Sequence, residues 1–228
     1  MNTVAALRKF FTFVSTLGAG LALLLAGGGA LAQGADTGLV NMVSGEVAYT
    51  PSSGAPGKVQ AFMKVREGDR FTLSAGAQLR IVYFETARQE RWIGPATVRA
   101  AKGASDASSG KPAEVSTLPG AAAPRMARVP DLIQNARLGG IQVRGTRKAP
   151  PLNNEDKRAV ESARAGYEQM KREAAADDIS PEMMLAAALH EYMLYADMRP
   201  VVDEMLRKQP ANEDVKTLSS WLDTMIKR

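Results

Sequence analysis

The sequence predicts an α+β protein built as two units, an all-β sandwich or roll followed by a linker and an all-α helical unit. Short apolar runs separated by glycine turns fill residues 33–100, a pattern typical of β-structure. Apolar residues at helical spacing fill residues 153–228, which favours a helical bundle or a helical-repeat-like unit. Residues 101–152 between them are basic and rich in Ala, Gly, Ser and Pro, a composition typical of linkers.

The composition already excludes several classes of site. The chain of 228 residues has no Cys, so disulfides, thiol catalysis, zinc–thiolate centres and a lipoprotein anchor are excluded. Its single His excludes a metal site made of several histidines. We therefore expect no metal and no cofactor.

The N-terminus has the features of an export signal. Arg8 and Lys9 end a short basic segment, and residues 10–35 contain no charged side chain. A basic start followed by an apolar stretch is typical of secretory signals. We therefore predict a periplasmic location.

The expected cleavage site follows the apolar stretch. Ala30 and Ala32 place small residues at both positions that signal peptidase recognises, and Gln33 would begin the mature chain, so residues 1–32 form a signal peptide. The alternative is an uncleaved anchor, because the uncharged run is long enough to span a bilayer. The glycine triplet at 27–29 disfavours that alternative.

Seven short runs are expected as strands of the β-unit. They are 38–43, 45–50, 59–65, 71–73, 78–84, 90–93 and 96–99. In the run 78–84, Leu79, Ile81 and Tyr83 lie on one face, and Gln78 and Arg80 lie on the other.

Within the linker, three segments have some structural preference. Residues 115–118 are apolar enough for an edge strand, and residues 129–138 predict a short helix. Residues 141–144 predict a further strand, which either returns to the β-unit or stays in the linker.

Four helices are expected from residue 153 onward. The first has an apolar stripe at Val160, Ala163, Tyr167, Met170 and Ala174. The second begins with Ser180 as its N-cap and Pro181 at the first helical position. It extends to about Ala196 and is apolar nearly all round, so we expect it to be the central helix.

Pro200 is expected to open the third of these helices, and Pro210 to end it. Asn212 is expected to cap the fourth. The core face of the fourth helix is predicted as Val215, Leu218, Leu222 and Met225. We expect residues 153–228 to fold as an autonomous unit.

The β-unit contains several glycine-turn motifs in a recognisable order. They are Gly45-x-Val47, Glu67-Gly68-Asp69, Gly76 before the run 78–84, and Gly94-Pro95. Over about residues 38–100 the chain resembles the FecR domain, a β-rich periplasmic module. It departs from that family at 85–88, where an Asp-Gly turn is common.

The resemblance implies a role in envelope sensing or signalling. It does not extend to a cytoplasmic anti-sigma region, because only about nine residues precede the apolar run. Residues 181–226 are weakly similar to a tetratricopeptide unit, which implies a helical interaction module.

Some residues have a catalytic interpretation beside a structural one. His190 lies on the predicted central helix without a neighbouring nucleophile or acid motif, so we expect a buried or edge histidine. Glu85 and Glu90, flanked by Arg88 and Arg91, could form a glycosidase pair. We expect instead charges at a solvated hairpin tip.

Aromatic and sulfur-containing residues have similar alternatives. Trp92 is either a core residue or a surface aromatic for sugar or protein contacts, and core is favoured. The helical region contains seven methionines, for which core packing is favoured over a soft-metal site. They are Met170, Met183, Met184, Met193, Met198, Met205 and Met225.

Together these patterns predict a non-enzymatic periplasmic protein-interaction module, accessory to envelope sensing, signalling or assembly. Its expected partner is an envelope or inner-membrane protein. The alternative is a protein that binds cell-wall glycan or another envelope polymer. The modest positive charge left after export argues against nucleic acid, and the oligomeric state stays open.

Overall fold

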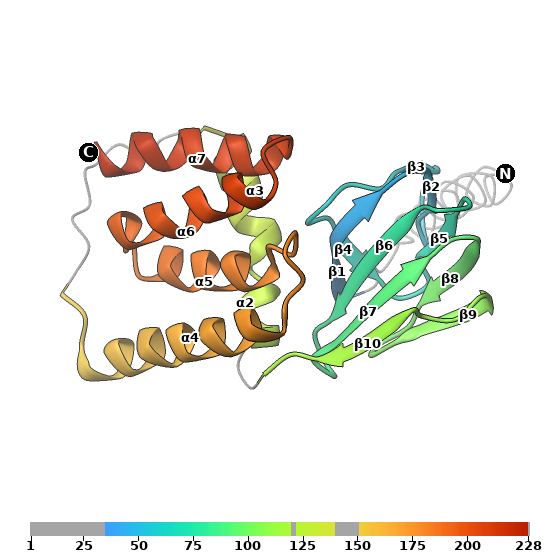
Figure 1. The fold of residues 1–228 in the computed structure, drawn as a ribbon, viewed down its shortest axis with the longest axis horizontal. Coiled ribbons are helices and arrows are strands. Elements are labelled where there is room, and N and C mark those ends of the chain that lie inside the picture. The colour runs from blue at the N-terminus through green and yellow to red at the C-terminus, as the bar shows by residue number, and fades with distance from the viewer. Residues whose placement is uncertain (1–34, 120–121, 140–150, 228) are drawn as a thin grey trace, which may run out of the picture. The chain divides into compact units, whose positions relative to one another are not determined.

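The structure, a computed structural model, describes residues 35–119, 122–139 and 151–227 (Figure 1). They belong to one unit that spans residues 34–228. The predicted signal peptide, its cleavage site at Ala30, Ala32 and Gln33, and the strand predicted at 141–144 lie outside the described residues.

Ten strands come first along the described chain. They are β1 (Asp36–Ser44), β2 (Val47–Thr50), β3 (Gly57–Lys58), β4 (Lys64–Arg66), β5 (Arg70–Leu73), β6 (Gln78–Tyr83), β7 (Arg88–Ile93), β8 (Ala96–Ala100), β9 (Ser105–Ser109) and β10 (Glu114–Thr117). They form two antiparallel five-stranded sheets (Figure 1). Sheet A has the order β10-β7-β6-β1-β4, and sheet B has the order β3-β2-β5-β8-β9.

The two sheets enclose an apolar core, which we call the sandwich core. Leu79, Ile81 and Tyr83 of β6 pack there against Phe71 and other residues of sheet B, and all four side chains are fully buried. The alternation predicted for this strand is confirmed, because one face of a strand contributes every second side chain to a core.

One predicted strand of the β-unit is shorter in the structure, and the chain changes sheet between the first two runs. The run 59–65 is a strand only from Lys64, because Phe62 adopts a left-handed backbone (φ 61°) and donates its N–H to Val40 O. Residues 45–50 do not pair with the run before them. Gly45 (φ 76°) instead leads the chain from sheet A into sheet B.

The β-unit also extends beyond residue 100. Strands β9 and β10 lie in the segment predicted as a linker, one at an edge of each sheet. Most of their side chains are polar or small and exposed, so their pairing rests on backbone hydrogen bonds and leaves no hydrophobic pattern in the sequence. The edge strand considered at 115–118 is therefore present, one residue earlier.

The turn motif Glu67-Gly68-Asp69 is held by its last residue. The Asp69 carboxylate is buried and accepts hydrogen bonds from Ser52 N, Arg66 N and the Tyr49 hydroxyl, at 2.8, 2.9 and 3.1 Å. Burial and the nearby carboxylate raise the pKa of Tyr49 to about 12. The acid therefore has a structural role here.

Six helices follow within the described residues. They are α2 (Ala122–Met126), α3 (Val129–Arg137), α4 (Asn154–Glu173), α5 (Ser180–Glu191), α6 (Tyr195–Lys208) and α7 (Glu213–Ile226). The short helix predicted at 129–138 and the four predicted after 153 are present. The expected N-cap at Asn212 is confirmed, because its side chain accepts hydrogen bonds from Asp214 N and Val215 N.

The boundary between α5 and α6 differs from the prediction. The chain leaves α5 through Met193 in a left-handed conformation (φ 54°), and α6 begins five residues before Pro200. Pro200 lies in the second turn of α6, where it has no N–H to donate to the Ala196 carbonyl, so α6 lacks one intrahelical hydrogen bond there. Ser180 is the first helical residue of α5 and not its N-cap.

Helices α4 to α7 lie side by side in chain order, and α2 and α3 cross behind them (Figure 1). Helix α5 is the central element, with every residue from Ser180 to Leu189 buried. The helical core includes α2 and α3, so the helical part begins at residue 122 and not at 153. No helix among the described residues is long and apolar enough to cross a membrane.

Candidate functional site

The outer face of sheet A packs against the helices. Leu39 of β1 and Val82 of β6 point away from the sandwich core and belong to the same apolar cluster as α5. Asn41 and Arg80 lie on this face too, because they alternate with inward residues of the same strands. We call this contact region the junction.

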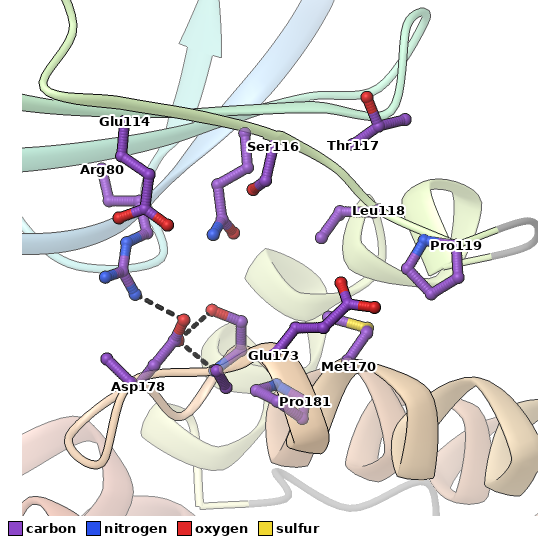
Figure 2. Close-up of a pocket in the computed structure, with 14 residues that line it drawn as sticks. Arg80, Glu114, Ser116, Thr117, Leu118, Pro119, Met170, Glu173, Asp178 and Pro181 are labelled. Carbon is purple, nitrogen blue, oxygen red and sulfur yellow. Dashed lines mark hydrogen bonds and ion pairs between the residues drawn. The ribbon is translucent and has the colours of Figure 1, made fainter.

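A cavity of about 150 Å³ opens beside the junction (Figure 2). β10 and the segment after it form one side, and the end of α4 with the start of α5 forms the other. Its lining residues are Arg80, Gln89, Glu114, Ser116, Thr117, Leu118, Pro119, Met170, Glu173, Ala174, Ala175, Asp178, Ser180 and Pro181. Three of the four charged residues are acidic.

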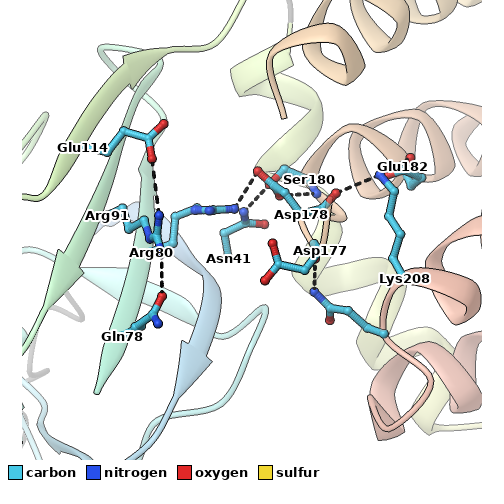
Figure 3. A network of polar contacts seen from close by, with 11 residues as sticks. Asn41, Gln78, Arg80, Arg91, Glu114, Asp177, Asp178, Ser180, Glu182 and Lys208 are labelled. Atoms are coloured by element: carbon cyan, nitrogen blue, oxygen red, sulfur yellow. Dashed lines mark hydrogen bonds and ion pairs between the residues drawn. The ribbon is translucent and has the colours of Figure 1, made fainter. Parts of the chain in front are cut away.

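The basic residue of the cavity is already paired. Arg80 Nη1 lies 2.6 Å from Asp178 Oδ2, and the two residues are only 4% and 6% exposed (Figure 3). Asp178 Oδ1 also accepts hydrogen bonds from the backbone N–H of Ser180, at 2.8 Å, and from its hydroxyl. Asn41 Nδ2 donates to the same hydroxyl oxygen. The guanidinium therefore ties sheet A to the start of α5.

A second buried pair supports this network from the helical side. Lys208 Nζ lies 2.8 Å from Glu182 Oε1 and donates to the backbone carbonyl of Asp178 at 3.0 Å. Glu182 is fully buried. The loop that positions Asp178 is thus held from both α5 and α6.

Some polar groups at the cavity have capacity left for a ligand. Gln89 Oε1 is buried and accepts no hydrogen bond from any described residue. Glu173 is exposed and forms no ion pair with a described residue, and Glu114 has only a long contact of 3.8 Å to Arg91. The carboxylate oxygens and Gln89 Oε1 are acceptors, so these atoms suit a ligand group rich in donors.

The arrangement does not resemble an activated nucleophile. The Ser180 hydroxyl donates to a carboxylate that already neutralises Arg80, and no imidazole lies among the lining residues. Within the described residues, no group of three or more His, Cys, Asp or Glu side chains could hold a metal ion. The site can bind and orient a polar group.

His190 lies elsewhere, at the end of α5. Its ring packs against those of Tyr195 and Trp221, with centroids 6.0 and 5.4 Å apart. Burial lowers its pKa, and Nδ1 has no partner among the described residues. It is a half-buried histidine in an aromatic cluster.

The expectation for the charged hairpin is wrong at Glu90. This residue lies inside the sandwich at 1% exposure, because it alternates in phase with buried Trp92 on β7. Its carboxylate accepts from Arg88 Nε, Trp92 Nε1 and Ser105 N, at 2.6, 3.0 and 3.3 Å. Glu85 is exposed in the preceding turn, as expected for a hairpin tip.

The other candidates are core residues. Trp92 is 1% exposed, which confirms its predicted core position. Among the seven methionines of the helical region, Met193 and Met225 are half-buried and the other five are buried in the helical core.

The residues of the junction were not predicted as a site. The signal that could have found them is a single cation, Arg80, on the second face of a strand whose Val82 is apolar on that same face. Such a strand is covered on both sides.

The chain was compared with protein-family models, with curated proteins and with solved structures, and none of them matches it.

Proposed function

We propose that this protein is a non-enzymatic interaction module of the periplasm, accessory to envelope sensing, signalling or assembly. The proposal takes its location from the basic and apolar N-terminal pattern with Ala30 and Ala32. Its partner is an envelope or inner-membrane protein.

The observation that carries the proposal is the fixed attachment of a helical layer to a β-sandwich. Helices α4 to α7 each pack on the next helix in the chain, as in helical-repeat interaction modules. The Arg80–Asp178 pair and the shared apolar cluster hold this layer against sheet A. A binding protein gains affinity from such preorganisation, because less entropy is lost on binding.

The chemistry of the buried groups also favours binding over catalysis. Asp178, Glu182 and Glu90 are each engaged by a cation or by backbone N–H groups. A general acid or base needs a proton that it can exchange with a substrate. Carboxylates that are paired with cations or accept backbone N–H groups in this way stabilise the fold.

Glycan binding receives less support. A sugar platform needs an exposed aromatic face, and both tryptophans are buried, Trp92 at 1% and Trp221 at 6% exposure. Tyr49 is half-buried, with its hydroxyl bound to Asp69.

Photo-crosslinking in living cells tests the proposal. A photoreactive amino acid would replace Glu168, which is exposed on α4, and in a matched variant Thr72, which is exposed on sheet B. We expect one envelope protein, identified by mass spectrometry, to crosslink at one of the two positions and to recover this chain in the reciprocal experiment. Crosslinks to none, or only to abundant proteins in proportion to their amounts, would contradict the proposal.

A further inference from the structure

Strand β10 is an open edge of sheet A. It pairs with β7 on one side, and no described strand pairs with its other side. Leu118 N donates to Ala87 O in the same ladder, so the backbone groups of Ser116 also face β7. The N–H and C=O groups of Val115 and Thr117 therefore face away from the sheet.

This edge carries fewer charged residues than the opposite edge of the same sheet, since Glu114 is the one charged residue of β10. β4 carries Lys64 and Arg66, whose side chains pair with Asp36 at 3.1 and 3.5 Å. Charged residues discourage the addition of another strand. β10 instead exposes the apolar side chain of Val115, which is 44% accessible.

The cavity lies directly beside this edge. Glu114, Ser116 and Thr117 of β10 line it, and Glu173 lines it from α4 (Figure 2). An added strand would direct every second side chain toward the face that Gln89 and Ser116 share. The volume of about 150 Å³ suits a single side-chain end group, since a cavity of that size accommodates a molecule of about the size of benzene.

The charge of the cavity selects that side chain. Arg80 is neutralised by Asp178, which leaves the carboxylates of Glu173 and Glu114 and the free acceptor Gln89 Oε1. An ammonium or guanidinium group supplies only donors and a positive charge. A carboxylate ligand would be repelled.

We propose that the edge of β10 binds an extended segment of a partner protein as a sixth strand of sheet A, with a Lys or Arg side chain of that segment in the cavity beside Glu173. Backbone pairing with Val115 and Thr117 supplies the affinity, and the cavity supplies the selectivity. This inference rests on the proposed function and names the chemistry of the partner.

A strand-forming probe peptide tests the inference on the full chain. The probe is Thr-Val-Thr-Lys-Thr-Val-Thr with blocked ends, labelled for fluorescence anisotropy. Val115→Pro removes an N–H that faces the open edge and leaves the ladder to β7 intact, so we expect binding to weaken at least about tenfold. The matched control is Ala107→Pro on β9, the exposed edge of sheet B, where we expect a change of less than about twofold.

Charge is tested on both molecules. Glu173→Gln is expected to weaken the lysine peptide about two- to fivefold and to reduce the salt dependence of its binding. A peptide with Glu in place of Lys is expected to bind at least about tenfold more weakly. Equal binding of both peptides, or equal effects of Val115→Pro and Ala107→Pro, would overturn the proposal.

Two further outcomes distinguish a failure of this inference from a failure of the proposed function. If the chain dimerises and Val115→Pro makes it monomeric, the edge binds a second copy, and the partner-peptide proposal is wrong. If Val115→Pro still captures the envelope partner found by photo-crosslinking, the interaction function stands and the strand-addition mode is wrong.

Discussion

At the scale of single residues, the Arg80–Asp178 pair should be one of the two most sensitive ion pairs among the described residues, beside Lys208–Glu182. Asp178→Asn keeps the size of the side chain and leaves a guanidinium without its counter-charge in a buried site. We expect a loss of about 3–5 kcal/mol in the free energy of unfolding. Urea titration followed by circular dichroism measures it.

An exposed pair provides the matched control. Asp131 lies 3.3 Å from Lys64 but its side chain is 68% accessible, so Asp131→Asn should cost less than about 1 kcal/mol. Replacing both partners, as Arg80→Met with Asp178→Leu, should restore most of the stability. Equal losses in the Asp178 and Asp131 variants would refute this account.

His190 should make stability depend on pH. Burial lowers its pKa in the folded state, whereas the unfolded value is about 6.5, so the unfolded chain binds the proton more readily. Stability is therefore full above about pH 7.5, falls as the pH drops through 6.5, and stops falling below the folded pKa.

The difference between wild type and His190→Phe isolates this effect, because both proteins share the same carboxylates. Unfolding free energies measured from about pH 8 to pH 5 should show a flatter profile for the variant. Parallel profiles would show that the imidazole titrates equally in both states.

At the scale of elements, α5 should not tolerate a charge that has no partner. Leu189 is fully buried, so Leu189→Asp places a carboxylate among apolar side chains and should cost about 3–5 kcal/mol. The same substitution at Leu138, which is 49% exposed at the end of α3, should cost less than about 1 kcal/mol. Thermal midpoints of the two variants check this, and similar midpoints would contradict the central position of α5.

How far the elements were predictable depends on the origin of their stability. The sequence pattern predicts α7 and α4, because an asparagine cap (Asn212 or Asn153) precedes a regular apolar stripe in each. β9 does not, because its sequence Ser-Asp-Ala-Ser-Ser forms a strand only through backbone pairing with β8. Local composition therefore suggested a linker.

The junction was not predicted, for a different reason. Arg80 and Asp178 are far apart in the chain, and their contact depends on which face of sheet A the helices cover. The alternation of β6 placed Arg80 opposite the sandwich core, yet alternation alone cannot distinguish a solvated face from one covered by another element. Glu90 was predicted at a solvated hairpin tip for the same reason, since its burial depends on partners across the sandwich.

At the scale of the whole molecule, the two parts should unfold together. The chain carries one tryptophan in each part, Trp92 in the sandwich core and Trp221 in the helical core. Fluorescence of Trp221→Phe therefore reports on the sandwich, and fluorescence of Trp92→Phe reports on the helices. We expect each variant's fluorescence and helical circular dichroism to follow one shared urea transition, because Leu39 and Val82 pack in the helical core.

The control is the double variant Leu39→Ala with Val82→Ala, which thins the apolar contact at the junction. In the Trp221→Phe background, the helical circular dichroism and the Trp92 fluorescence of this double variant should show unfolding transitions at different urea concentrations. Separate transitions already in the wild-type background would mean that the junction contributes little to cooperativity.

The two faces of β1 set a limit on how this chain could have changed during evolution. Leu39 belongs to the helical core and its neighbour Val40 to the sandwich core, so a single strand contributes side chains to both cores. Recombination that exchanged the helices for unrelated ones would leave Leu39 and Val82 on a bare apolar surface, which promotes aggregation. We therefore expect the sandwich and the helices to be inherited together, so that relatives of one part retain the other.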